Sequence, residues 1–424
     1  MSGSRSRGED APPGVPVEGL PTGARGPRRW LTRGVFGIAL ASFLSDLGHE
    51  VPTALLPSFL VGMLGAPAAA LGLVEGAADA LAGAAKLAGG ALADDPARRR
   101  ATAVGSYATT AVLSGLIGAA GAPWQVGVLR GGAWAARGLR TPARNALLAE
   151  AAPPAAYGRA YGFERAMDNL GAIAGPLLGV ALVAALGIRG AILASAAPGL
   201  LAAAAVFDAV RHIRARGDAP RRTTRRVRPR IGAVLRGTLG RTMAAIAAFE
   251  VGNVAATLLI LRATEVFEPD RGARGAAALG LVLYTGYNLA ATLASVPAGR
   301  LADRRGPRVA FALGAWLFLL AYLAFAAGGS GLVLAAAFVL AGVGIGCVET
   351  AEHAAVARLA PPPVQGSAFG VLGAAQSLGN LLASSITGIL WTTLAPGAAF
   401  LWPAGWMAAS LALLALAAQR TPGP

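Results

Sequence analysis

The chain has 424 residues, of which 55% are hydrophobic and only 14% are charged. Because a soluble domain averages about 45–50% apolar and about 25% charged residues, this composition excludes a water-soluble protein and indicates an integral membrane protein. The single cysteine, Cys347, excludes an intrachain disulfide. The net charge of +16 does not indicate a nucleic-acid partner, because the arginines cluster between long apolar runs, as the positive-inside rule predicts for loops beside a lipid bilayer.

The sequence begins with a polar tail and continues with twelve apolar runs. Residues 1–33 are rich in Pro, Gly and Arg, which predicts a disordered basic tail. The next run is longer than a signal-peptide core and contains acidic residues, so we expect it to be a retained span. Spans of sufficient length are predicted at 34–62, 69–93, 100–121, 123–145, 160–187, 189–210, 239–264, 276–301, 307–328, 330–357, 366–394 and 397–418.

These runs predict an all-α membrane protein with two six-helix bundles, at 34–210 and 239–418. The segment 211–238 is too polar to span a membrane and too rich in Arg and Pro to pack as a core, which predicts a linker. Residues 419–424 form a short tail. Basic residues concentrate in alternate loops, so we expect a multi-pass protein of the cell membrane with a cytoplasmic linker and both termini in the cytoplasm.

The second half of the sequence repeats the first, which indicates an internal duplication. LGLV at 71–74 recurs at 279–282, and 149–163 matches 357–371 without a gap. In the first span of each half, Asp46 and His49 align with Glu250 and Asn253. Two parallel six-helix repeats are typical of one class of secondary transporters, in which the substrate binds between the halves near the middle of the membrane.

Several motifs resemble those of the major facilitator superfamily. GRLADRRGPRV at 299–309 resembles its loop motif, GALADDPARRR at 90–100 is a less complete copy, and GAIAGPLLGV at 171–180 is similar to the fifth-helix motif of its antiporters. Arg130 matches the fourth-helix arginine. The resemblance implies a twelve-helix transporter with a central cavity, and it assigns motif roles to Gly90, Asp94, Arg98, Arg99, Gly299, Asp303, Arg304, Gly306 and Arg308 in the loops and to Gly171, Gly175, Pro176 and Gly179 in the helix.

The motifs also have a physical interpretation. An Asp at the end of one span, followed by arginines, is able to cap helix ends and form a charge relay that locks two helices together; in the second copy these residues are Asp303, Arg304 and Arg308. The glycine spacing in 171–179 predicts a groove that lets two helices approach closely. Pure packing and an antiporter-specific role are both open interpretations of that groove.

Several ionisable residues fall inside predicted spans, where an unpaired charge costs at least ~2.5–3.5 kcal/mol. Burial favours the neutral form of a carboxyl, so Asp46 and Glu50 are predicted to carry a coupled proton. Lys86 and Asp79 are the expected neutralising ion pair. The predicted residues of the cavity and of proton coupling are Asp46, His49, Glu50, Glu75, Asp79, Lys86, Arg130, Arg137, Asp168, Glu250 and Asn253.

The repeat register also predicts a gate at the cytoplasmic end. It places Arg144 opposite Glu352 and residue 141 opposite Glu349. We therefore expect Arg140 and Arg144 to pair with Glu349 and Glu352 when the halves close on the cytoplasmic side. The alternative is that the arginines only obey the positive-inside rule and Glu352 pairs with its neighbour, a histidine.

The sequence contains no GxxxxGK[ST] loop, so we expect transport to run on an ion gradient, with no cofactor. The segment GHEVPT lacks the second histidine of a zinc protease helix, which argues against an intramembrane protease, and we expect the protein not to be an enzyme. The favoured function is proton-coupled efflux of a small molecule by a monomer. One alternative is an exporter of a metal cation or chelate that uses His49 with Asp46 and Glu50, and another is a membrane sensor that transports nothing.

Overall fold

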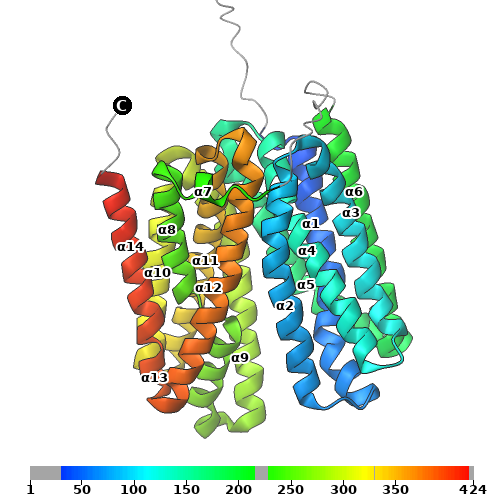
Figure 1. The fold of residues 1–424 in the computed structure, drawn as a ribbon. Helices are drawn as coiled ribbons and strands as arrows, with labels where there is room; N and C mark the ends of the chain where they lie inside the picture. Colours follow the sequence, from blue (N-terminus) through cyan, green and yellow to red (C-terminus); the bar gives the residue numbers. More distant parts are fainter. Residues whose placement is uncertain (1–29, 215–227, 329, 420–424) are drawn as a thin grey trace, which may run out of the picture.

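The computed structural model of the protein describes residues 30–214, 228–328 and 330–419, and every regular element in these ranges is a helix. Two helical bundles stand side by side (Figure 1). The first bundle contains α1 (Arg33–Pro57) with the π-helical turn η1 (Ser58–Met63), α2 (Ala68–Ala93), α3 (Pro96–Leu116) with η2 (Ile117–Ala119), α4 (Pro123–Ala151), η3 (Pro154–Ala156), α5 (Tyr157–Ala194) and α6 (Ala196–Arg214).

The second bundle has the same plan. It contains α8 (Gly237–Gly252), α9 (Ala256–Arg305), α10 (Pro307–Ala327), α11 (Gly331–Leu359), η4 (Pro362–Val364), α12 (Gln365–Thr393), α13 (Pro396–Ala399) and α14 (Leu401–Gln419). A short helix, α7 (Ile231–Val234), precedes it. The pairs α2 with α12 and α5 with α9 form the main contacts between the bundles.

The helices coincide with the predicted spans, with two differences. Helix α5 covers the fifth span and the start of the sixth, and it turns at Gly187, which has a positive φ of 69°. Helix α9 covers the end of the seventh span and the whole eighth, and it turns at Gly272, which has a positive φ of 67°. The seventh span is interrupted at residues 253–255, between α8 and α9. Transporters place such breaks where backbone lines a cavity.

Six helical segments of the described ranges are individually long and apolar enough to cross a membrane: Pro154–Ala194, Ala196–Ile213, Gly237–Arg305, Pro307–Ala327, Gly331–Leu359 and Pro396–Ala417. Helices α1 to α4 and α12 fall short because polar side chains lower their hydropathy. Of these five helices, α2, α4 and α12 make contacts between the two bundles.

One end of the molecule carries the arginine-rich loops, and we call it the arginine-rich end. It contains residues 94–98, 152–156, 303–308 and 360–364, together with α7 (Figure 1). The predicted tail lies largely outside the described residues, as does 215–227 of the predicted linker. In the described part of this segment, α7 packs on α12 and Val234 is fully buried.

The two bundles have different cores. The second is built around aromatic rings, such as Phe249 against Phe318 and Phe325 against Phe338, whose centroids are 5.2 Å apart in both pairs. The first instead buries several arginines, and the Arg130 side chain is completely enclosed. Buried charges require partners, so the first bundle must hold an extensive polar network.

Candidate functional site

A cavity of about 870 Å³ lies between the two bundles. Helices α2, α4 and α5 line it from the first half, and α8, α11 and α12 line it from the second. Its volume is within the range of small-molecule sites, about 300–1,000 Å³. The predicted residues on its wall are Asp79, Lys86, Arg137, Arg140, Arg144, Asp168, Glu250, Asn253 and Glu349, whereas Asp46, His49, Glu50, Glu75, Arg130 and Glu352 lie outside the wall.

The predicted polar face of α1 forms one cluster with α4. His49 lies between two carboxyls: its Nδ1 is 3.3 Å from Asp46 Oδ1 and its Nε2 is 3.2 Å from Glu50 Oε1. Arg137 of α4 contacts the same Nε2 and lies 3.5 Å from Asp46 Oδ1. Since arginine stays protonated in proteins, Arg137 compensates Asp46 and opposes a metal cation at His49. The described residues contain no group of three His, Cys, Asp or Glu side chains suited to a metal ion.

Arg130 joins α4 to two other helices. Its guanidinium is 3.0 Å from Glu75 Oε1 of α2 and donates to Thr53 Oγ1 of α1 at 3.1 Å. It also stacks on Trp134, 3.4 Å from the ring centre. Trp134 in turn donates through Nε1 to Asp79 at 3.0 Å. This network fixes the spacing of α1, α2 and α4, so Arg130 and Glu75 have a clear structural role.

The predicted Lys86–Asp79 ion pair is wrong. Lys86 extends away from its own half and donates from Nζ to Ser377 Oγ of α12 at 2.8 Å. Gly370 and Gly373 of α12 leave room for the lysine, because a Cβ on Gly373 would lie 2.9 Å from Lys86 Cδ. The lysine therefore links the two halves across the cavity.

Arg144 takes part in an ion cluster with α5. Its NH1 is 2.9 Å from Glu164 Oε1 and 3.3 Å from Asp168 Oδ1. Arg165 pairs with the same two acids, at 2.8 Å from Glu164 and 3.2 Å from Asp168. Glu164 and Arg165 fall inside the predicted fifth span, and their charge was the signal that could have identified them.

The predicted gate pairs are wrong for this conformation. Arg140 donates to Ser45 Oγ at 2.5 Å and stacks on Tyr107, 4.2 Å from the ring centre. Neither Arg140 nor Arg144 forms an ion pair with Glu349 or Glu352 in the described structure. Both arginines use partners within their own half. Arg140 contacts α1 and α3, and Arg144 pairs with acids of α5 that the repeat register does not reveal.

The acidic residues of the second half have a different environment. Glu250, Glu349 and Glu352 are buried or half-buried, and within the described ranges none of them forms an ion pair with Lys or Arg. Glu250 follows Phe249 near the end of α8 and accepts a hydrogen bond from Asn253 Nδ2 at 3.0 Å, at the break in the seventh span. Of these acids, Glu250 and Glu349 lie on the cavity wall, opposite the ion-paired Arg144 and Asp168 of the first half.

Asp303 joins the halves at the arginine-rich end. It accepts hydrogen bonds from the backbone N–H groups of Gly158 (2.7 Å) and Arg159 (3.1 Å) at the start of α5. The side chains of Arg159 (2.8 Å) and Arg358 (3.1 Å) also donate to it. A carboxylate at a helix N-terminus is stabilised by the free N–H groups there. The predicted relay is wrong in its partners, because Arg304 and Arg308 form no ion pair in the described residues.

Asp94 repeats this arrangement in the incomplete motif. It accepts from Ser367 N (2.9 Å) and Ser367 Oγ (2.6 Å) at the start of α12. Burial raises the pKa of Asp94 above its ordinary value, against the opposing effect of the Ser367 hydrogen bonds. Gly306 has φ 92°, which explains the motif glycine between α9 and α10. Both motif copies therefore cap a helix of the opposite half.

The remaining loop arginines act within the first half. Arg99 donates to the Ala93 carbonyl at 2.7 Å and lies 3.4 Å from Glu150 Oε2. Arg98 is 3.7 Å from Asp95. These contacts connect the loop after α2 with the end of α4, and Glu150 is a partner that the motif did not predict.

Motif glycines permit the close approach of the halves. Gly299 of α9 packs against Gly158 of α5, and Gly90 of α2 packs against Gly366 and Gly370 of α12. A Cβ on any of these would strike backbone atoms of the opposite half. The arginine-rich end is thus closed by two equivalent sets of contacts, each built from one glycine and one aspartate.

The predicted glycine groove of α5 is confirmed as a packing surface. A Cβ on Gly171 would lie 2.6 Å from the Phe43 carbonyl oxygen, and one on Gly175 would lie 2.5 Å from Glu50 Cβ. Gly179 faces Val51, and Pro176 lies within α5. The groove therefore brings α1, with its polar cluster, against α5.

Comparison with known proteins agrees with this architecture. The family model for the Major Facilitator Superfamily matches residues 38–281 and 245–424. The chain belongs to the Major Facilitator Superfamily. An uncharacterized MFS-type transporter, MJ1317 of Methanocaldococcus jannaschii, is 26% identical over 377 residues, which cover 88% of this chain and 92% of that protein. An uncharacterized protein of Mycobacterium tuberculosis H37Rv, Rv2265, is 32% identical over 158 residues, 37% of this chain and 38% of that protein.

Solved superfamily structures share the fold. A bacterial homologue of the iron transporter ferroportin, in an outward-facing state, aligns with a TM-score of 0.76 at 14% identity over 92% of this chain and all of that one. The fucose:proton symporter FucP of E. coli aligns with a TM-score of 0.68 at 16% identity over 90% and 98%. At these identities the likeness shows the fold alone. As a superfamily member, the chain is a multi-pass membrane transporter that works by alternating access.

Proposed function

We propose that this superfamily member is a proton-coupled exporter of a small molecule in the cytoplasmic membrane, with its arginine-rich end in the cytoplasm. The observation that carries the proposal is Glu250. It is a buried carboxyl on the wall of the central cavity, and no Lys or Arg of the described structure pairs with it. Leaving such a charge uncompensated is costly, so Glu250 binds either a proton or a group of the substrate.

Competition between proton and substrate for one carboxyl produces antiport. When the arginine-rich end opens, a substrate entering from the cytoplasm displaces the proton from Glu250. When the other end opens, a proton from outside replaces the substrate. Asn253 holds the carboxyl at the helix break through its hydrogen bond to Glu250. The glycine-rich α5 groove, which resembles that of the superfamily's antiporters, supports this direction of transport.

Asp46 is a weaker candidate for the coupled proton than the sequence suggests. Arg137 and His49 both contact it, so its negative charge is compensated without a proton. The same guanidinium opposes the alternative of a metal exporter. No observation in the described structure favours a metal cation at His49, and the ferroportin-like fold of one neighbour is shared by superfamily members that carry other substrates.

A transport screen in everted membrane vesicles tests the proposal. Vesicles containing the wild-type protein are energised with a proton gradient and exposed to a panel of small molecules, while a pH-sensitive dye reports proton release. We expect at least one compound to be taken up with proton release, and Glu250→Gln to abolish both signals.

Asp208→Asn is the matched control, because Asp208 is an exposed carboxyl on α6, outside the cavity wall. It should transport like wild type. Gradient-driven transport that survives in Glu250→Gln would contradict the assignment of Glu250, and no gradient dependence with any compound would favour the sensor alternative.

A further inference from the structure

On the first-half wall of the central cavity, Lys86 is the cation that remains open to a ligand. Its ammonium has three N–H donors, and the described structure gives it one hydrogen bond, to Ser377 of α12. No acid of the described ranges lies within ion-pair distance of this ammonium. Lys86 is half-buried and lines the cavity, so two donors are left for an anionic group there.

The arginines of the same wall are already engaged. Arg137, Arg144 and Arg165 form ion pairs with acids of their own half. Arg140 has no ion pair among the described residues, but its side chain is buried and stacks on the Tyr107 ring. An anion in the cavity therefore finds its most accessible partner in the lysine.

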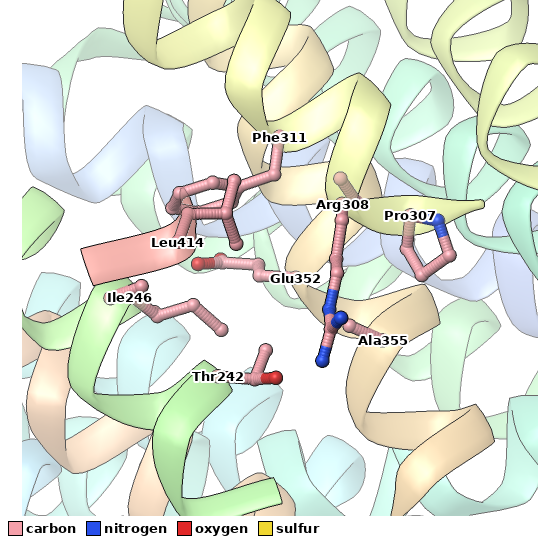
Figure 2. A pocket seen from close by; sticks show the side chains of 10 residues that line it. Thr242, Ile246, Pro307, Arg308, Phe311, Glu352, Ala355 and Leu414 are labelled. Atoms are coloured by element: carbon pink, nitrogen blue, oxygen red, sulfur yellow. The ribbon is translucent and has the colours of Figure 1, made fainter. Parts of the chain in front are cut away.

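Of the three acids of the second half that lack a Lys or Arg partner in the described structure, Glu250 is the one that most needs a cation. Figure 2 shows Glu352 beside Phe311 and Leu414, in a small pocket that shares no lining residue with the central cavity. Glu349 lines the cavity but is half-buried, so cavity water solvates its charge. Glu250 is only 2% exposed, so a cationic ligand group is its natural partner.

Helix α12 lies between Lys86 and Glu250. It packs against α2 and against α8. Lys86 is bound at Ser377, and Glu250 packs at Gly379, where an added Cβ would lie 2.5 Å from the Glu250 Cβ. Two residues advance a helix by about 3 Å, so the two contacts lie at nearly the same height on different sides of α12. A small molecule that lies along the cavity face of α12 is able to reach both charges.

Charge balance selects the substrate. A group that replaces the proton of Glu250 must be positive, because the carboxylate otherwise stays unpaired. A purely cationic molecule would leave Lys86 unpaired, whereas a carboxylate on the same molecule supplies its partner. One lysine charge matches a carboxylate better than a doubly charged phosphate. Apart from Asp79 and Lys86, the wall residues of α2 are Gly, Ala and Leu, which favours an apolar remainder.

We propose that the exported molecule is a small zwitterion with an apolar side chain, such as an amino acid. Its ammonium binds Glu250 in place of the proton, and its carboxylate binds Lys86. The inference rests on the proposed exchange of substrate and proton at Glu250, and it adds the chemical class of the substrate. Such a molecule gives both open charges of the cavity a partner at once.

NMR spectroscopy of the full-length protein in lipid nanodiscs tests the proposal. Lys86 is the only lysine of the sequence, so isotope-labelled lysine gives a single side-chain signal. The protein is titrated with leucine, phenylalanine and β-alanine, with their carboxamides, which are cations, and with their N-acetyl derivatives, which are anions. We expect at least one amino acid to shift the Lys86 signal in a saturable way. Its two derivatives should bind at least roughly ten-fold more weakly, because each lacks one charge.

Two variants separate the two charges, with calorimetry as the measure of binding. Lys86→Gln should weaken binding of the amino acid at least roughly ten-fold and leave binding of its carboxamide unchanged. Glu250→Gln should weaken binding of both. Arg236→Gln is the matched control, because it removes a positive charge at an exposed position outside the cavity wall. It should bind the amino acid like wild type.

Three results would overturn the proposal: no saturable shift with any amino acid, a carboxamide that binds wild type as tightly as the amino acid, or unchanged amino-acid affinity in Lys86→Gln. If that variant does not fold, the wild-type titration decides. The titration needs no proton gradient. An amino acid that binds through Lys86 but is not exchanged for protons in vesicles contradicts the proposed function alone. Antiport through Glu250 of a compound without both charges contradicts this inference alone.

Discussion

At the scale of single residues, the two halves treat buried charge in opposite ways. In the first half, arginines of α4 form ion pairs with acids of three other helices: Asp46 of α1, Glu75 of α2, and Glu164 and Asp168 of α5. In the second half, Glu250, Glu349 and Glu352 form none with the described Lys and Arg residues. Paired charges hold helices in register, whereas an unpaired carboxyl exchanges protons. The sequence identified most of these residues but not their pairing, because partners are chosen by side-chain reach across helices.

The pairing of Asp46 with Arg137 makes a stability prediction. Removing one partner of a buried ion pair typically costs about 3–5 kcal/mol, so Asp46→Asn and Arg137→Gln should each lower the free energy of unfolding. The double variant has no uncompensated charge at this position and should recover part of the loss. Thermal unfolding of the purified variants in detergent measures this. A double variant as unstable as the worse single one would show that the two residues do not act as a pair.

At the scale of helices, glycine determines where the acids lie. Gly171 of α5 packs on α1 at Asp46, and Gly379 of α12 packs on α8 at Glu250, with a Cβ on Gly379 only 2.5 Å from Glu250 Cβ. The repeat in the sequence aligned Asp46 with Glu250. The structure shows the same contact, a glycine packed against the acid, in both halves. The break after α8 was not predictable, because an apolar run does not reveal where a helix is interrupted inside it.

The α5 groove predicts a clear contrast between two glycines. Gly175→Ala introduces a Cβ that would lie 2.5 Å from Glu50 Cβ, and overpacking of this kind typically costs about 1–3 kcal/mol. Gly105→Ala in α3 meets nothing within 4 Å and should be neutral or stabilising, because alanine favours a helix by roughly 1 kcal/mol over glycine. Thermal unfolding in detergent compares the stability of the two variants. Equal stability of the two variants would mean that α1 does not pack tightly in the groove.

At the scale of the whole molecule, two symmetric contacts close the arginine-rich end. Asp94 caps α12 and Asp303 caps α5, each across the boundary between the halves. The sequence predicted the twelve spans, the duplication and the importance of these loops. It did not predict that each aspartate binds the opposite half, since a motif shows spacing along the chain and not the partner in space.

Loss of both caps should open this end. Hydrogen bonds to charged groups contribute about 1.5–3 kcal/mol each, so the Asp94→Asn, Asp303→Asn double variant should shift the population toward a more open state. Spin labels report the distance between the two halves at this end. They are attached at two exposed positions, through Arg98→Cys and Pro362→Cys in a Cys347→Ala background. Asp95→Asn is the control, because Asp95 caps only its own helix, at Ala97 N. An unchanged distance distribution in the double variant would contradict this role of the caps.

The central claim is that substrate and proton move in opposite directions through one cavity, and proteoliposomes without metabolic energy test it most directly. A gradient of a substrate found in the vesicle screen is imposed across the bilayer, and an internal pH dye follows protons. The account predicts that outward flow of substrate drives protons inward against their own gradient, and that Glu250→Gln abolishes this proton movement while Asp208→Asn preserves it. Protons that move with the substrate, or do not move at all, would contradict proton-coupled export.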